Sequence, residues 1–216
     1  LDLTRIIAGP VAGRTLAAHG ANVLRITSPN LPSIPSLVID NGRGKRSAFL
    51  DLKTSEAKEN LQALAKDADV FIQGYRPSAI AGLGFSPEKV AALRPGIVYG
   101  SLSAYGTTGP WAERRGFDLL VQTVSGINHS EAQAKGSSQP IALPNQTLDH
   151  ATGYLLAFGV MAALLRRSIE GGSWHVQVSL AQTGHWLQRQ DRIPKGFSIK
   201  DQTPANIEAY LETQPS

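Results

Sequence analysis

The sequence predicts an α/β fold in which a Rossmann-like parallel sheet is wrapped by helices and followed by a linker arm. Segments with the apolar spacing of amphipathic helices alternate with short apolar runs typical of strands. This alternation at short spacing favours parallel strands joined by right-handed crossovers. The 216 residues, 42% hydrophobic and 18% charged, are enough to bury one substantial core. Ligands of such a sheet bind beyond the carboxyl ends of its strands.

The elements of the first half follow from capping and turn residues. Gly20 suits the left-handed conformation that closes a helix. Prolines and the pair Asn41-Gly42 mark a surface loop, and Thr54 or Ser55 can cap a helix. We expect a helix at 10–19, a strand at 23–27, a surface loop at 28–44 carrying basic residues, a strand at 47–52, a helix running to Lys66 and a strand at 69–73.

The second half continues the alternation. Ser86-Pro87-Glu88 is typical of a helix N-terminus, and basic residues followed by glycines end a long apolar helix. We expect helices at 77–82, 86–93 and 117–126, a strand at 97–103, a polar connection at 131–140, a helix at 148–167 and a strand at 175–180. We assign residues 1–187 to one large α/β domain, and residues 188–216 to a linker or crossing arm.

Composition excludes several classes of function. The chain has no Cys, which excludes disulfides, thiol nucleophiles and Cys-ligated zinc, and its five His residues show no metal-ligand spacing, so we assign no metal. No apolar run reaches the ~20 residues of a membrane span, and no secretory signal is recognisable, so we expect no membrane partner and a cytoplasmic location. The net charge of +4 attracts anions, but no nucleic-acid module is present. Because the first residue is not Met, we expect that the natural start is missing.

Three familiar motifs do not fit the sequence. A phosphate-binding loop needs Gly five positions before its Gly-Lys pair, and Ile39 stands there before Gly44-Lys45. The run Gly82-Leu83-Gly84-Phe85 lacks the third glycine of a dinucleotide fingerprint. No Gly-x-Ser-x-Gly elbow occurs. Nucleotide hydrolysis, NAD binding and serine hydrolysis are therefore disfavoured.

A series of short strings carries a family resemblance. The strings are Leu1-Asp2-Leu3-Thr4-Arg5, Ala8-Gly9-Pro10, Gly20-Ala21-Asn22-Val23, Asn41-Gly42-Arg43-Gly44-Lys45-Arg46-Ser47, Leu50-Asp51-Leu52-Lys53, Tyr75-Arg76-Pro77, Gly82-Leu83-Gly84, Tyr105-Gly106, Gly109-Pro110, Gly116-Phe117-Asp118 and Leu148-Asp149-His150-Ala151-Thr152-Gly153. In their order and spacing they resemble the N-terminal half of family III CoA-transferases. This family includes formyl-CoA and carnitine CoA-transferases and α-methylacyl-CoA racemase.

The resemblance implies a large domain that binds CoA, a smaller domain that this chain lacks, and a homodimer of two interlocked chains. The implied substrates are an acyl-CoA and a carboxylic acid, with CoA as a substrate and no tightly bound cofactor. In transferases of this family an aspartate attacks the thioester to give a mixed anhydride and then an enzyme-linked thioester. The motif places that aspartate at Asp149, although an acid in a first helical turn is also common for stability alone.

The resemblance also implies the residues of a CoA groove. The matching positions are Ala8, Ser28, Lys53, Tyr75, Leu83 and Tyr105, with Arg43, Lys45 and Arg46 as nearby phosphate contacts. For any single basic residue a solvated surface role is about as common, and the two tyrosines could equally be packing residues.

Two alternatives to transfer stay open. The racemase branch carries a His before Asp118, where this chain has Phe117, but His150 beside Asp149 leaves racemisation possible in principle. The chain could also be an inactive CoA-binding fragment. Gly74 stands where the family commonly has Asn, and Ser103 where formyl-CoA transferase has Lys, which disfavours formate or oxalate as substrates.

Overall fold

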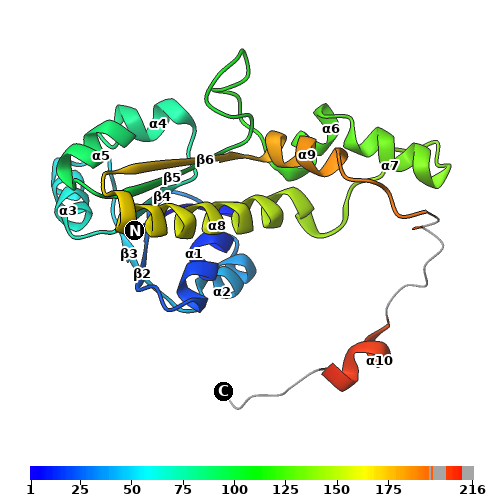
Figure 1. Cartoon of the computed structure of the whole chain (residues 1–216), viewed down its shortest axis with the longest axis horizontal. Coiled ribbons are helices and arrows are strands. Elements are labelled where there is room, and N and C mark those ends of the chain that lie inside the picture. Colours follow the sequence, from blue (N-terminus) through cyan, green and yellow to red (C-terminus); the bar gives the residue numbers. More distant parts are fainter. Residues whose placement is uncertain (195, 197–202, 211–216) are drawn as a thin grey trace.

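The computed structural model describes residues 1–194, 196 and 203–210 and contains one six-stranded parallel sheet (Figure 1). The strand order is β3-β2-β1-β4-β5-β6, and every neighbouring pair is parallel. The predicted α/β fold is confirmed. The strands are β1 (Asp2–Leu3), β2 (Val23–Thr27), β3 (Lys45–Phe49), β4 (Val70–Gln73), β5 (Val98–Ser103) and β6 (Trp174–Ser179).

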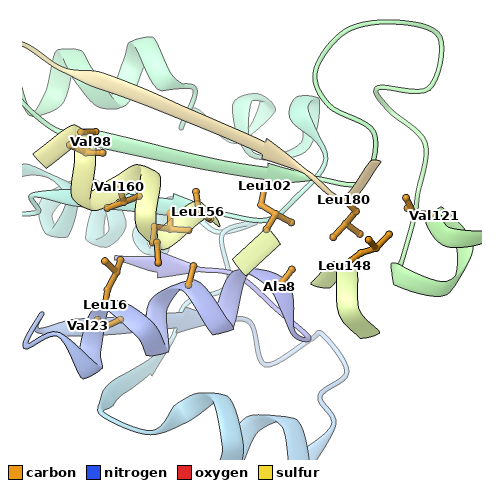
Figure 2. Packing of buried hydrophobic residues seen from close by; sticks show 14 of the residues in the cluster. Ala8, Leu16, Val23, Val98, Leu102, Val121, Leu148, Leu156, Val160 and Leu180 are labelled. Atoms are coloured by element: carbon orange, nitrogen blue, oxygen red, sulfur yellow. The ribbon is translucent and has the colours of Figure 1, made fainter. Parts of the chain in front are cut away.

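One face of the sheet is covered by α1 (Ala8–Ala18) and α8 (Thr147–Glu170), which pack closely on each other. Figure 2 shows Leu156 and Val160 of α8 beside Val98 and Leu102 of β5, with Leu16 of α1 below them. Helix α8 is long and apolar enough to cross a membrane by length and composition. In this structure its inner side forms part of the buried core.

The opposite face is covered by α3 (Ser55–Lys66), α4 (Pro77–Gly82) and α5 (Pro87–Leu93). Thr54 caps α3 as predicted, since its side chain accepts a hydrogen bond from the Ala57 backbone N–H. Three stacked aromatic rings, Phe71, Phe85 and Tyr99, fill the space between strands and helices. The sheet is therefore buried on both faces, as parallel sheets require.

The remaining helices are α2 (Pro35–Gly42), α6 (Asp118–Val124), α7 (Ile127–Lys135) and α9 (Leu180–Gln188), with the short η1 (Pro144–Gln146), α10 (Pro204–Ile207) and η3 (Glu208–Tyr210). Figure 1 shows α6, α7 and α9 grouped beyond one end of the sheet. Figure 2 places Val121 of α6, Leu148 of α8 and Leu180 of α9 together there. This cluster holds the first turn of α8 against α6.

Two predicted loops are wrong because they contain helices. Within 28–44, Pro35 starts α2, since proline suits the first helical position, and the Asn41-Gly42 turn signal instead marks its end. Within 131–140, α7 continues to Lys135, bracketed by Gly126 and Gly136, both in the left-handed conformation. The strand predicted at 47–52 is shifted, because β3 begins at Lys45.

The division at residue 187 stays a prediction. Helix α9 runs to Gln188 and so crosses the expected boundary by one residue. Residues 195, 197–202 and 211–216 of the expected linker lie outside the described residues.

Candidate functional site

A cleft of about 710 Å³ opens at the carboxyl ends of β1, β4 and β5. This is where an open parallel sheet binds its ligands. Its walls come from the turns that follow the three strands, and Asp149 and Leu180 close it from α8 and α9. In the turn after β1, Ile6 has a φ of 69°, a left-handed conformation that is strained for a β-branched residue. Strain of this kind is typical of functional sites.

Asp149 is the third residue of α8 and is 7% exposed. Its backbone N–H donates a 2.9 Å hydrogen bond to Oδ2 of Asp118, itself buried in the first turn of α6. Burial, and secondarily the Asp118 carboxylate, raise the pKa of Asp149 to about 7. The carboxyl is therefore poorly solvated and only partly ionised at neutral pH.

Gln122 holds this carboxylate pair in place from a fully buried position. Its Nε2 donates to Oδ1 of Asp118, and its Oε1 accepts a 2.8 Å hydrogen bond from the backbone N–H of Leu143. Leu143 leads directly into Asn145 and Gln146, which take left-handed conformations before α8 begins. The network thus fixes both Asp118 and the chain entering α8. Gln122 was not predicted as a site residue. Its position four residues after Asp118 on one helix is the signal that could have indicated its contact with that carboxylate.

The pKa of Asp149 predicts a pH-dependent stability. Because the folded-state pKa lies above the ordinary value of 3.8, the folded protein binds this proton more tightly, and stability falls as the pH rises from about 4 to about 7. We expect Asp149→Asn to raise the free energy of unfolding by about 2 kcal/mol at pH 8, with the gain shrinking as the pH falls from 7 to 4. Urea unfolding across this pH range measures it.

Asp118→Asn serves as the comparison, since it removes the neighbouring negative charge. It should lower the pKa of Asp149 and move the pH dependence toward lower pH. A gain in Asp149→Asn that does not change with pH would contradict the assigned cause.

Four arginines also line the cleft: Arg5, Arg76, Arg114 and Arg115. Arg114 lies over the ring of Trp111, with its guanidinium carbon 4.8 Å from the ring centre. In the same loop Glu113 accepts a 3.1 Å hydrogen bond from the backbone N–H of Ser78 at the start of α4. The sequence analysis missed Arg114 and Arg115, although they stand directly before the string Gly116-Phe117-Asp118. The cleft thus combines a buried carboxyl with a positively charged rim.

A smaller pocket of about 170 Å³ brings together four predicted groove residues, Ser28, Lys53, Tyr75 and Leu83. Tyr75 and Leu31 line both this pocket and the larger cleft. Ala8 lines the larger cleft. The two hollows therefore adjoin each other at Tyr75 and Leu31, with Lys53 in the smaller one and Asp149 in the larger, and we refer to the two together as the groove. Burial raises the pKa of the Tyr75 hydroxyl, which stays protonated and able to donate a hydrogen bond.

The other predicted residues lie outside this groove. The Lys45 side chain is 1% exposed, and its Nζ is 2.8 Å from Oδ2 of Asp2 and 2.7 Å from the carbonyl oxygen of Pro10. Arg46 bonds to Asn22 at the amino end of β3, and Arg43 bonds to Asp40. Tyr105 lines a separate pocket of about 480 Å³ and packs edge-on against Trp111. The basic cluster is thus a structural ion pair and two surface contacts.

In the described part of the chain no three His, Cys, Asp or Glu side chains are grouped as metal ligands. The site is defined by its carboxylates, its arginines and the groove.

A parallel α/β domain with a buried, partly protonated aspartate at the end of a basic groove is typical of an enzyme that handles an anionic substrate by acid-base or nucleophilic chemistry. The family model of CoA-transferase family III matches residues 1–213. The chain therefore belongs to CoA-transferase family III, as its sequence strings indicated.

Relatives and solved structures agree with this assignment. "Probable fatty acyl-CoA transferase Rv3272" of Mycobacterium tuberculosis is 36% identical over 201 residues, which are 87% of this chain and 50% of that protein. Human "Succinyl-CoA:glutarate CoA-transferase" is 30% identical over 193 residues, 83% of this chain and 43% of the relative. The crystal structure of a CAIB/BAIF family protein from Brucella suis matches with a TM-score of 0.80 and 28% identity, covering 87% of this chain and 53% of the other. The chain spans about half the length of these relatives.

Proposed function

We propose that the protein transfers CoA between an acyl-CoA and a carboxylic acid, with Asp149 as the nucleophile. The observation that carries this proposal is the position of Asp149, a buried carboxyl in a cleft that has a positively charged rim and adjoins the smaller pocket of Lys53. Membership of CoA-transferase family III supports CoA transfer in general.

In the proposed reaction an oxygen of ionised Asp149 attacks the thioester carbonyl carbon. The carbon–sulfur bond breaks, CoA leaves as the thiolate, and the acyl group stays on Asp149 as a mixed anhydride. The thiolate then attacks the Asp149 carbonyl carbon, which releases the first acid and leaves CoA on the aspartate as a thioester. The acceptor acid repeats the two steps in reverse, so atoms and charge balance.

The groove suggests how CoA lies. We place the nucleotide end in the smaller pocket, where Lys53 offers a cation, Ser28 a hydroxyl and Leu83 an apolar surface. The pantetheine arm then passes Tyr75 and Ala8 to bring the thioester to Asp149. The cations that line the cleft, and are available there to a phosphate or carboxylate, are Arg5, Arg76, Arg114 and Arg115. Arg43, Lys45, Arg46 and Tyr105 have no part in this path.

CoA transfer is favoured over racemisation because the described lining of the cleft includes no histidine that could act as a second proton-transfer group. A racemase needs a second group that moves a proton at the α-carbon. Phe117, before Asp118, is 62% exposed and lines the cleft, and among the described lining residues there is no His. His150 follows Asp149 in sequence but does not line the cleft.

We also propose that the protein acts as a homodimer in the cytoplasm. The outer side of α8 carries Tyr154, Phe158, Leu165 and Ile169, each at least half exposed, and a second chain would cover such an apolar surface. Light scattering of the purified protein distinguishes a dimer from a monomer.

Trapping of the intermediate tests the proposed nucleophile. Hydroxylamine captures activated carboxylates, so incubation with an acyl-CoA panel and hydroxylamine should convert the Asp149 side chain to a hydroxamate, located by mass spectrometry of peptides. Asp149→Ala should give no adduct. Binding of CoA by calorimetry without any adduct would overturn the nucleophile and leave a CoA-binding protein; an adduct on another carboxylate would move the role there.

A further inference from the structure

Another pocket, of about 390 Å³, is lined in part by the loop formed by residues 28–34. Its walls are β2, β3, this loop and α2. The residues that line both this pocket and the cleft of Asp149 are Arg5, Ile6, Leu31, Pro32 and Ile34. Thr27, Ser28 and Leu31 also line the smaller pocket in which we place the CoA nucleotide. Of these three hollows, this pocket is the one that Arg25 and Ser47 line.

Two strands give this pocket a polar floor. Arg25 and Thr27 lie two residues apart on β2, and the parallel register pairs them with Ser47 and Phe49 on β3. Side chains alternate along a strand, so these four share one face of the sheet, and all four line the pocket. The floor thus combines a guanidinium and two hydroxyls with one aromatic edge.

The side chains around this floor include more cations than anions. Arg14 and Lys45 are already paired, each at 2.8 Å, with Asp40 and Asp2. Burial lowers the pKa of Lys45, and the charges of Arg25 and Arg14 lower it further, so the cations crowd one another.

Arg25 itself is half-buried, and its Nε is buried with no hydrogen-bond partner in the described part of the chain. Arg5 donates a hydrogen bond to a backbone acceptor, the carbonyl oxygen of Pro32, and has no carboxylate partner in the described part of the chain. A buried guanidinium nitrogen left unpaired is costly, and an anion would remove that cost.

We propose that this pocket binds a small tetrahedral oxyanion of the size of phosphate. Arg25 and Arg5 supply charged donors, and Thr27 and Ser47 supply hydroxyl donors. Asn41 adds a buried amide whose Nδ2, the donor group of this side chain, makes a long 3.5 Å hydrogen bond to the Ile6 carbonyl oxygen. A bound anion would restrict the movement of the loop 28–34 and would thereby stabilise one wall of the cleft. The site does not depend on chemistry at Asp149.

Titration with inorganic phosphate at constant ionic strength tests the proposal, using calorimetry on the purified protein and on two matched variants. Arg25→Gln removes the lining charge. Arg46→Gln removes an equal charge from the neighbouring strand at a residue that lies outside the pocket. We expect Arg25→Gln to weaken phosphate binding about tenfold or more and Arg46→Gln to change it less than twofold. No phosphate binding by the unaltered protein, or equal weakening in both variants, would overturn the site.

A second arm separates this site from the phosphates of CoA. Phosphate affinity should persist at saturating CoA and at saturating dephospho-CoA. Displacement of phosphate by CoA but not by dephospho-CoA would assign the pocket to the 3′-phosphate of CoA and overturn a separate site. If Arg25→Gln does not fold, as judged by thermal unfolding, Arg25→Lys and Ser47→Ala carry the comparison, and each should weaken phosphate binding.

Discussion

Replacing Asp149 by Asn is expected to lower the kcat/KM of CoA transfer by about 10³-fold or more. The amide keeps the size and position of the carboxyl but offers no ionised oxygen to attack a thioester. The backbone N–H of residue 149, which bonds to Asp118, is unaffected by the change. The measurement follows exchange of CoA between an acyl-CoA and a carboxylic acid by chromatography, using the natural full-length enzyme.

The control for this result is Asp67→Asn, which makes the same change at an exposed residue after α3. It should leave transfer within about twofold, as surface substitutions usually do. The affinity of Asp149→Asn for CoA should stay close to that of the unaltered protein, because the groove residues Ser28, Lys53 and Tyr75 are untouched. A variant that keeps a tenth of the transfer rate would show that Asp149 is not the nucleophile.

The raised pKa of Asp149 depends on neighbours that hydrogen bonds hold in place. A carboxyl that must be desolvated to react, yet must also ionise, depends on small changes in its neighbours. Asp118 both receives the backbone N–H of Asp149 and opposes its ionisation, and Gln122 fixes Asp118 to the chain that enters α8. The arrangement stabilises one geometry for the reactive group at a cost in folding free energy.

The sheet could be predicted from the sequence because its strands are short apolar runs bounded by turn residues. Four of the six strands fall within one residue of their predicted ranges, β3 starts two and ends three residues before its predicted range, and the two-residue β1 was not placed. The helices α2 and α7 were missed because each is short and lies in polar, proline- or glycine-rich sequence, where local signals indicate a loop. Pro35 and Gly136 mark ends of these helices, and a single sequence does not distinguish that use from a turn.

The predicted groove residues that follow the ends of strands lie close together. Ser28 comes directly after β2 and Tyr75 two residues after β4, so the carboxyl edge of the sheet places both in one pocket. Lys45 was expected among exposed cations, but it begins β3 and points into the structure, where Asp2 neutralises it. Arg114 and Arg115 reach the cleft through a long loop whose path is set by contacts such as Glu113 with Ser78. No local pattern encodes such a path.

The second large effect concerns Gly153, where α8 crosses α1. A Cβ built at this position would lie 2.4 Å from the carbonyl oxygen of Ala8 and 2.8 Å from Cβ of Val11. Neither atom can move without shifting α1, because one is backbone and the other is fully buried. The glycine therefore lets the N-terminus of α1, with the cleft residue Ala8, approach the first turns of α8.

Gly153→Ala is accordingly expected to destabilise the protein by about 3 kcal/mol, although alanine favours a helix by about 1 kcal/mol over glycine. The matched change Gly82→Ala, in α4, meets no atom within 4 Å and should be neutral or stabilising. Urea unfolding of both variants measures the difference. Because overpacking at Gly153 would push Ala8 away from Asp149, the folded fraction of Gly153→Ala should also bind CoA more weakly, whereas stability equal to that of Gly82→Ala would contradict the close packing of the two helices.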